Sequence, residues 1–145
     1  MQPRRVAIVG AALSDTGRVD DKTVHELHYQ GVTRALADAG LGKDDVGGFC
    51  SVGTGALAPV EVAEYLGLRP TWADSTGVGG AAWEFMLEHA SAAIAMGHVD
   101  VVVLSLVCKS CVARSDSKGL AACDSKFSVV PVRTLTKGSR VTESS

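Results

Sequence analysis

Residues 81–107 carry the sequence AAWEFMLEHASAAIAMGHVDVVVLSLV, which joins a long helical pattern to the strongest strand pattern of the chain. The first part combines apolar residues with a polar stripe of Glu84, Glu88 and Ser91, and Gly97 is suited to the left-handed residue that ends a helix. Its many alanines permit close packing, so we predict a largely buried helix over 81–96. Residues 99–107 are apolar at successive positions, which is typical of a strand in a sheet covered on both faces.

The rest of the sequence also shows alternating strand and helix signals. Thr23 and Glu26 have the spacing of a capping box, and Gly40 provides a helix end. In chain order we predict a strand over 5–9, a helix over 23–40, a strand over 46–52, a short helix over 59–66 and a strand over 71–75. With the helix and strand above, this order predicts an α/β fold with a mixed, mostly parallel sheet between helices.

The sequence changes character after Lys118. Ser, Thr, Lys and Arg dominate from there on, and Phe127 to Val132 is the only apolar cluster. We therefore divide the chain into a domain over 1–118 and a divergent, poorly ordered tail over 119–145. We expect loop or frayed strand in the tail, with disorder beyond about Thr134.

Composition narrows the function classes. The 145 residues suffice for one ordinary domain, the net charge is −2, and only 5% of residues are aromatic. Nucleic-acid binding needs a concentrated basic face or stacking aromatics, and neither is visible. No apolar run approaches the roughly 20 residues needed to cross a bilayer. Four cysteines, three of them crowded together, favour a reducing cytoplasm.

A glycine-rich motif precedes the long helix. Gly77-Val78-Gly79-Gly80-Ala81-Ala82 matches G-x-G-x-x-A between a strand and a helix, the local context of a dinucleotide fingerprint. The acidic residue that should end the next strand is misplaced, however, because Asp100 begins that strand. The alternative is structural: the glycines allow the helix start to pack tightly.

Cysteines and histidines offer weaker signals. Cys108 and Cys111 form a C-x-x-C pair after a strand, which would suit redox chemistry, or zinc binding with Cys123; unpaired thiols fit better because no further ligand is evident. His25 and His28 are spaced to chelate, but no third ligand is visible, and His89 and His98 near the end of the long helix fit structural roles. Cys50 is either a nucleophile or, more in keeping with free cysteines, a core residue.

Several segments together resemble the N-terminal half of a thiolase, more narrowly of the lipid-transfer-protein (sterol-carrier) type. They are Val6 to Ala12, Ala35 to Leu41, Val60 to Pro70, Val78 to Met86, and Met96-Gly97 leading into Asp100 to Val103. The resemblance covers residues 5 to about 107 and continues patchily at 113–116 and 118. It implies one thiolase-like half as the fold and acyl-CoA thioesters as substrates, with coenzyme A entering as part of the substrate and no other cofactor or metal.

The resemblance also places the reactive position. A thiolase carries its nucleophilic Cys at the start of the long helix, and counting back from Gly97 puts Gly80 there. No catalytic set is therefore complete in this chain. Relatives that lack this Cys include retro-aldolases that cleave β-hydroxyacyl-CoA in lipid and steroid breakdown, a reaction that needs no acyl-enzyme. Amides of Gly79, Gly80 and Ala81 would then polarise the thioester oxygen.

The remaining family features lie outside this sequence. The catalytic His and second Cys of a thiolase, or their tyrosine substitutes, come from the other half, so we expect no turnover from a chain that looks truncated, frame-altered or fragmentary. The resemblance implies a homodimer, with residues 71–75 near the two-fold axis, and an OB-fold partner protein. A half without its mate would expose apolar surface and self-associate. The alternative function is a non-catalytic acyl-CoA- or lipid-binding module.

Overall fold

The computed structural model of this 145-residue chain describes residues 5–16, 19, 21–52, 55, 57–106 and 128–135. In chain order the elements are β1 (Arg5–Ile8), β2 (Ala12–Leu13), α1 (Val24–Ala39), η1 (Lys43–Asp45), β3 (Gly48–Val52), α2 (Ala58–Leu66), β4 (Trp72–Asp74), η2 (Gly79–Ala81), α3 (Ala82–Met96), β5 (Val101–Leu106) and β6 (Ser128–Leu135). None of the helices among these residues is long and apolar enough to cross a bilayer.

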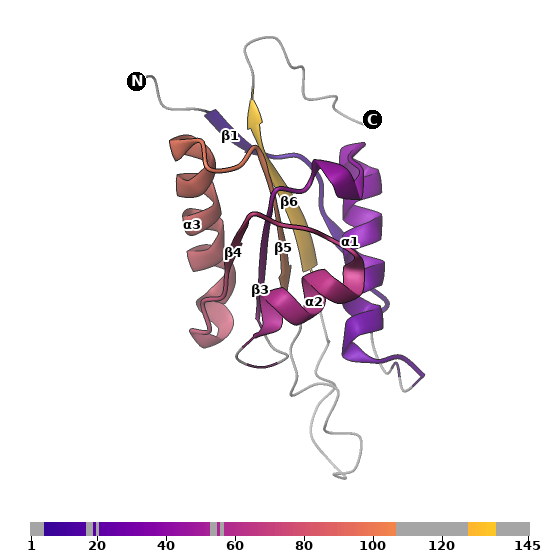
Figure 1. Cartoon of the computed structure of the whole chain (residues 1–145). Helices are drawn as coiled ribbons and strands as arrows, with labels where there is room; N and C mark the ends of the chain where they lie inside the picture. The colour runs from indigo at the N-terminus through magenta and orange to yellow at the C-terminus, as the bar shows by residue number, and fades with distance from the viewer. Residues whose placement is uncertain are drawn as a thin grey trace.

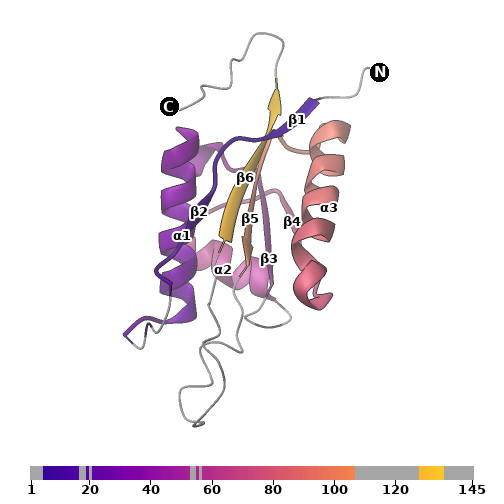
Figure 2. The same ribbon diagram turned by 180° about the vertical axis from the view of Figure 1, so that it is seen from behind.

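The strands form one mixed sheet in the order β1-β6-β5-β3-β4, and β2 pairs with β6 beyond the end of β1. β3 runs parallel to both β4 and β5, whereas β6 runs antiparallel to β1, β2 and β5. Helices α1 and α2 cover one face of the sheet and α3 covers the other (Figures 1 and 2). The α/β architecture with a mixed sheet between helices is confirmed: five of the six strands run in one direction, and the antiparallel pairings all involve β6.

The two faces of the sheet build two apolar cores. Phe49 of β3 and Val103 of β5 pack with α1 and α2. Cys50, Val102 and Leu104, which alternate with them along the same strands, pack with α3. Residues 101–105 of β5 are all buried, as expected for a strand whose successive side chains meet a helical layer on each side.

The end of the chain is the main correction to the sequence analysis. Ser128–Leu135 is not a loop or frayed strand: it is β6, paired over its length with β5 on one side and with β1 and β2 on the other. The expectation that residues 119–145 form a poorly ordered tail is therefore wrong for residues 128–135. Residues 119–127 and 136–145 lie outside the described part of the chain.

Pro131 is the reason that the sequence pattern does not predict strand β6. Proline has no amide hydrogen and is found in sheets at edges or bulges, so its presence argues against an internal strand. Here the Pro131 carbonyl accepts a hydrogen bond from the amide of Val9, at 3.0 Å, where β1 has ended and β2 has not begun. Because the nitrogen and carbonyl of a strand residue face the same side, the Pro131 nitrogen also faces Val9, and the one bond that proline cannot make falls where β1 has ended.

Local signals fix the ends of α1 as predicted. The Thr23 hydroxyl accepts from the Glu26 amide at 3.2 Å, and the Glu26 carboxylate accepts from the Thr23 amide at 2.6 Å. At the other end Gly40 adopts a left-handed conformation with φ of 64°, and the Leu41 amide donates to the Leu36 carbonyl at 2.9 Å. Such closure satisfies backbone groups that a helix end leaves without partners.

Glycine usually weakens a strand, but Gly48, the first residue of β3, is required by packing. A Cβ at this position would lie 2.8 Å from a methyl group of Val102 and 3.1 Å from the Trp72 ring. Only a residue without a side chain lets β3 fit between β4 and β5 at this point. The glycine that looked like a strand breaker is thus part of the strand.

Helix α3 is less buried than its alanine content suggested. Its face of Ala82, Met86, Ala90, Ala93 and Ile94 packs on the sheet. The opposite face remains accessible in the described chain: Phe85 is 44% and Met96 is 65% exposed. The prediction of a largely buried helix is wrong for these residues, because small side chains permit close packing but do not supply a second layer.

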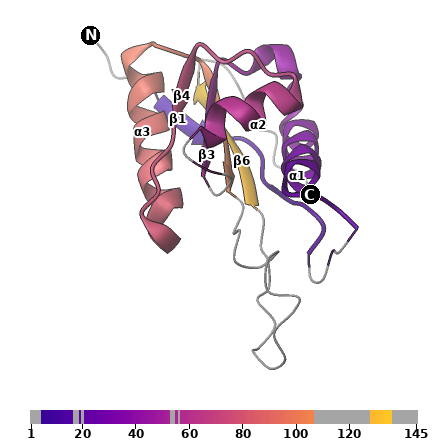
Figure 3. The same ribbon diagram turned by 60° about the horizontal axis from the view of Figure 1, so that its bottom comes forward.

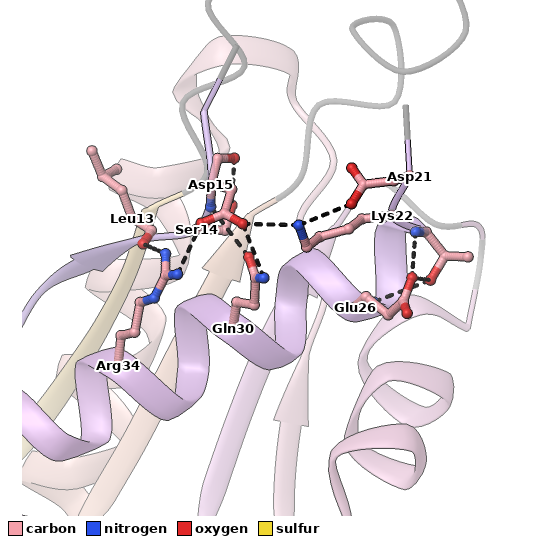
Figure 4. Close-up of polar contacts among 9 residues, drawn as sticks. Leu13, Ser14, Asp15, Asp21, Lys22, Glu26, Gln30 and Arg34 are labelled. Carbon is pink, nitrogen blue, oxygen red and sulfur yellow. Dashed lines mark hydrogen bonds and ion pairs between the residues drawn. The ribbon is translucent and has the colours of Figure 1, made fainter. Parts of the chain in front are cut away.

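A charged network holds the segment before α1 against that helix (Figure 4). The Asp15 carboxylate accepts from Arg34 at 2.8 Å and from Gln30 at 3.1 Å, and it pairs with Lys22 at 3.1 Å. Arg34 also donates to the carbonyl of Leu13 at 3.0 Å, at the end of β2. These donors, Arg34 foremost, lower the pKa of Asp15 from 3.8 to about 2.

Replacing Asp15 with Asn should make the protein less stable at neutral pH but not at pH 2. A lowered folded-state pKa means that the carboxylate stabilises the fold fully above pH 3.8, and that this contribution disappears as the pH falls towards about 2. Urea midpoints of both proteins between pH 7 and pH 2 measure this. Asp21→Asn, which removes only a 3.4 Å contact to Lys22, is the control and should shift the midpoint less. A gap between wild type and Asp15→Asn that stays constant with pH would contradict the assignment.

Candidate functional site

The predicted site residues lie together on the connection from β4 to α3. This connection runs along α3 to the beginning of the helix (Figure 3), where Gly79, Gly80 and Ala81 form the single turn η2. Residues 77–81 are all exposed. The backbone amides of this turn therefore lie at an accessible surface of the chain, next to the first turn of α3.

Gly79 is the residue that the turn requires. Its φ of 72° lies in the left-handed region, which other residues adopt only at a cost. Gly80 differs, since it is not among the glycines with positive φ, and a Cβ built on it would meet no heavy atom of the described residues within 4 Å. The position that the family resemblance assigns to the nucleophile could thus hold a side chain, and its being glycine is not imposed by the backbone.

The start of α3 has the electrostatics of an oxygen-binding site. Helix N-termini present amides that lack intrahelical partners and carry a partial positive charge. Ala81, the residue before the helix, makes no side-chain capping bond to these amides. The amide of Ala82 already donates to the Gly79 carbonyl, so the amides that could serve an oxygen developing negative charge, such as that of a thioester during enolate formation, are those of Gly79, Gly80 and Ala81.

A hydrogen-bonded group of three side chains braces this connection. The Asp74 carboxylate, at the end of β4, lies 2.8 Å from Nδ1 of His89 on α3 and accepts from the Thr76 hydroxyl at 3.2 Å. His89 is seven residues beyond Ala82, roughly 10 Å along the helix axis at 1.5 Å per residue. That separation is too large for His89 to share a small reacting group with η2, so the three residues position the connection.

The sequence analysis missed this pairing. His89 was assigned a structural role without a partner, and the pair joins residues 15 positions apart. The usable signal was Asp74 at the end of a predicted strand, directly before the loop that leads to the helix bearing His89.

Cys50 does not act as a replacement nucleophile. Its side chain is completely buried among residues that pack against α3, and burial, assisted by the nearby charge of Asp74, raises the pKa of its thiol to about 12. A neutral, enclosed thiol is a poor nucleophile. The interpretation of Cys50 as a core residue is confirmed.

The other candidate ligands are not brought together. His28 is buried against Ser105 of β5, with Nδ1 2.6 Å from the Ser105 hydroxyl, whereas the ring of His25 lies 5.3 Å from that of Tyr65 on α2. Among the described residues, no three side chains of the metal-binding types form a cluster. Cys108, Cys111 and Cys123 lie outside the described residues.

The described part of the chain does not provide the acidic residue that a dinucleotide-binding site needs after its second strand. Gly77 to Ala82 does stand between a strand and a helix, but Asp100 immediately precedes β5 and so lies at the amino end of that strand. A ribose-binding carboxylate should follow the carboxyl end.

A shallow groove of about 570 Å³ lies elsewhere, between α1 and α2 on the other face of the sheet. Its lining includes Glu26, Glu61 and Glu64 together with Thr23, His25 and Tyr65. Three carboxylates would repel the phosphates of coenzyme A, so the groove is a poorer thioester site than the start of α3.

Known proteins share part of this chain's sequence and its fold. The chain is 33% identical over 100 residues to the 17-hydroxy-3-oxo-4-pregnene-20-carboxyl-CoA lyase of Mycobacterium tuberculosis, a match that covers 68% of this chain and 26% of the relative. No protein-family profile matches the chain.

Solved structures point the same way. A chain of the Ltp2–ChsH2(DUF35) aldolase superposes with a TM-score of 0.68 and 25% identity, over 81% of this chain and 31% of that one. OleA of Xanthomonas campestris gives a TM-score of 0.71 over 92% of this chain and 56% of its own, at 13% identity, which supports the fold alone.

These matches define a class: the chain is thiolase-like, and the resemblance drawn from its sequence is confirmed. More particularly, it is a partial counterpart of such proteins, spanning about a quarter of the curated lyase that it matches. Its relatives are enzymes that include a lyase and an aldolase.

Introducing a thiol at Gly80, the position that the family resemblance assigns to the nucleophile, should be tolerated and should give a reactive group. We expect Gly80→Cys to melt at the wild-type temperature, because a Cβ there has open space. The helix-start amides should lower its thiol pKa below the ordinary value of about 8.5. The pH dependence of alkylation, assigned by peptide mass spectrometry, measures it, with the buried Cys50 as the slow internal reference. A pKa at or above that value would show that the helix start does not stabilise an anion.

Gly79 and Gly80 should respond differently to the same small change. Gly79→Ala forces alanine into a left-handed conformation and should lower the free energy of unfolding by about 1 kcal/mol. Gly80→Ala should leave it unchanged or slightly higher. Urea denaturation of the two variants tests the turn geometry, and equal effects would contradict it.

Proposed function

We propose that this chain forms the thioester-binding part of a thiolase-like lyase that cleaves β-hydroxyacyl-CoA by a retro-aldol reaction in lipid or steroid metabolism. One observation carries the proposal: the start of α3 offers accessible amides, but the nucleophile position is Gly80 and nothing in the packing around it forbids a side chain. The identity to a CoA-ester lyase supports the same reaction class.

The proposed reaction requires no covalent enzyme intermediate. A base removes the proton of the β-hydroxyl, the bond between the α- and β-carbons breaks, and its electron pair moves to form the enolate of the thioester. The β-carbon leaves as a carbonyl compound, and protonation of the α-carbon completes the acyl-CoA product. In this scheme the amides of Gly79, Gly80 and Ala81 stabilise the enolate oxygen, which is electrostatic catalysis of the oxyanion-hole type.

The base belongs to a part of the protein outside the site described here. His89 lies roughly 10 Å along α3 from its first residue, and Asp74 and Thr76 are hydrogen-bonded in one group with it, so we assign all three to holding the connection rather than to receiving the hydroxyl proton. We therefore propose that residues 1–145 alone bind a thioester without turning it over. The proposal includes a cytoplasmic homodimer in which β4, an edge strand of the sheet, lies near the two-fold axis.

A partner protein completes the proposal. The related Ltp2 is found in a structure with ChsH2, a DUF35 protein, and we propose that this chain's full-length form has a partner of the OB-fold type. The alternative function, a non-catalytic acyl-CoA-binding module, is favoured only by the absence of a nucleophile at Gly80. The two functions differ in whether the full-length protein has lyase activity.

Calorimetric titration with a β-hydroxyacyl-CoA tests the binding step. Gly80→Asp should reduce the affinity about tenfold, equivalent to roughly 1.4 kcal/mol, because its carboxylate competes for the helix-start amides. Gly80→Ala is the matched control and should bind as the wild type does. Equal affinity of all three proteins would reject the start of α3 as the thioester site.

Activity separates the enzyme from the binding module. The 145-residue chain should release no carbonyl product from the same thioester, whereas a protein that also contains the second thiolase-like half should release it. Turnover by the short chain would reject the proposed division of roles. Binding without turnover by the longer protein would favour the non-catalytic alternative.

A further inference from the structure

A second polar cluster lies on the opposite face of the sheet from η2 and takes no part in the proposed reaction. It comprises His28 of α1, Ser51 of β3 and Ser105 of β5, which are 1%, 0% and 1% exposed. Ser51 and Ser105 are register partners in neighbouring parallel strands, so their side chains project to the same side of the sheet. Each lies one residue before the end of its strand.

The hydrogen bonding of this cluster is incomplete. Nδ1 of His28 lies 2.6 Å from the Ser105 hydroxyl, but Nε2 of His28 and the hydroxyl of Ser51 have no partner among the described residues. A buried polar group without a partner costs about 1–3 kcal/mol, and most such groups in folded proteins are satisfied by the chain or by ordered water. Two such groups beside one hydrogen-bonded pair indicate that a further hydrogen-bonding partner occupies this cluster.

The charge and burial of the three side chains limit the chemical nature of this partner. Burial, with a smaller contribution from His25, lowers the pKa of His28 to about 3, so the imidazole is neutral at physiological pH and would not attract an anion. With exposed fractions of 1% or less, the three side chains admit no substrate-sized molecule. A neutral molecule of one heavy atom, able both to donate and to accept, fits these limits.

We propose that His28, Ser51 and Ser105 form an internal site for one long-lived water molecule, which links α1 to the carboxyl ends of β3 and β5. The water bonds Nε2 of His28 and the hydroxyl of Ser51, and Ser105 keeps its direct bond to Nδ1. Such a water has two protein partners, within the two to four that buried waters make.

Nuclear magnetic resonance of protein labelled with nitrogen-15 at histidine tests the site directly. His28, assigned by the loss of its signals in His28→Gln, should show a single neutral tautomer, and its ring should show a cross-relaxation signal to a slowly exchanging water. A His28 ring without a water signal would overturn the proposal. So would a direct bond from His28 or Ser51 to residues outside the described chain.

Stability measurements on Ser51→Ala test the water site independently, because the two possibilities change the unfolding equilibrium constant in opposite directions. If a water uses the Ser51 hydroxyl, Ser51→Ala removes one of its partners and should raise the unfolding equilibrium constant about fivefold. If the hydroxyl is buried without a partner, the same change removes a desolvated group and should lower that constant. Ser75→Ala, at an exposed position after β4, is the control and should leave it unchanged.

Discussion

The hydrogen bonds of β6 hold the two ends of the described chain together. β6 pairs with β5 on one side and with β1 and β2 on the other, and β1 and β2 have no other strand neighbour in the described sheet. Within the described sheet, β1 and β2 are therefore joined to the parallel strands β5, β3 and β4 only through β6, which lies late in the sequence. Because a strand's amides and carbonyls need partners, the sheet depends on this one insertion.

Sequence reasoning worked where the determinants are local. The capping box of Thr23 and Glu26, the left-handed Gly40 and the apolar run of β5 each specify an element through neighbouring residues, and these elements lie where predicted. It failed where distant residues decide. β6 tolerates Pro131 only because β1 and β2 are interrupted opposite it, and Gly48 suits a strand only because Val102 and Trp72 approach it.

The candidate site shows the same division. The family resemblance directed attention to Gly79, Gly80 and Ala81, and in the structure these consecutive residues form an exposed turn at the start of α3. The pairing of Asp74 with His89 and the meeting of His28 with Ser105 were not foreseen, because they join residues 15 and 77 positions apart. Whether a glycine is imposed by the backbone also required coordinates: Gly79 is, and Gly80 is not.

The position of β6 has a consequence for the growing polypeptide. As the chain leaves the ribosome, β5 emerges well before its antiparallel neighbour, and the amino-terminal strands wait unpaired until residues 128–135 appear. Throughout that interval β5 presents a bare, strongly apolar edge of the kind that recruits other chains. The nascent protein therefore passes through a vulnerable stage that ends only when its last described strand is made, and chaperone protection would matter most during that interval.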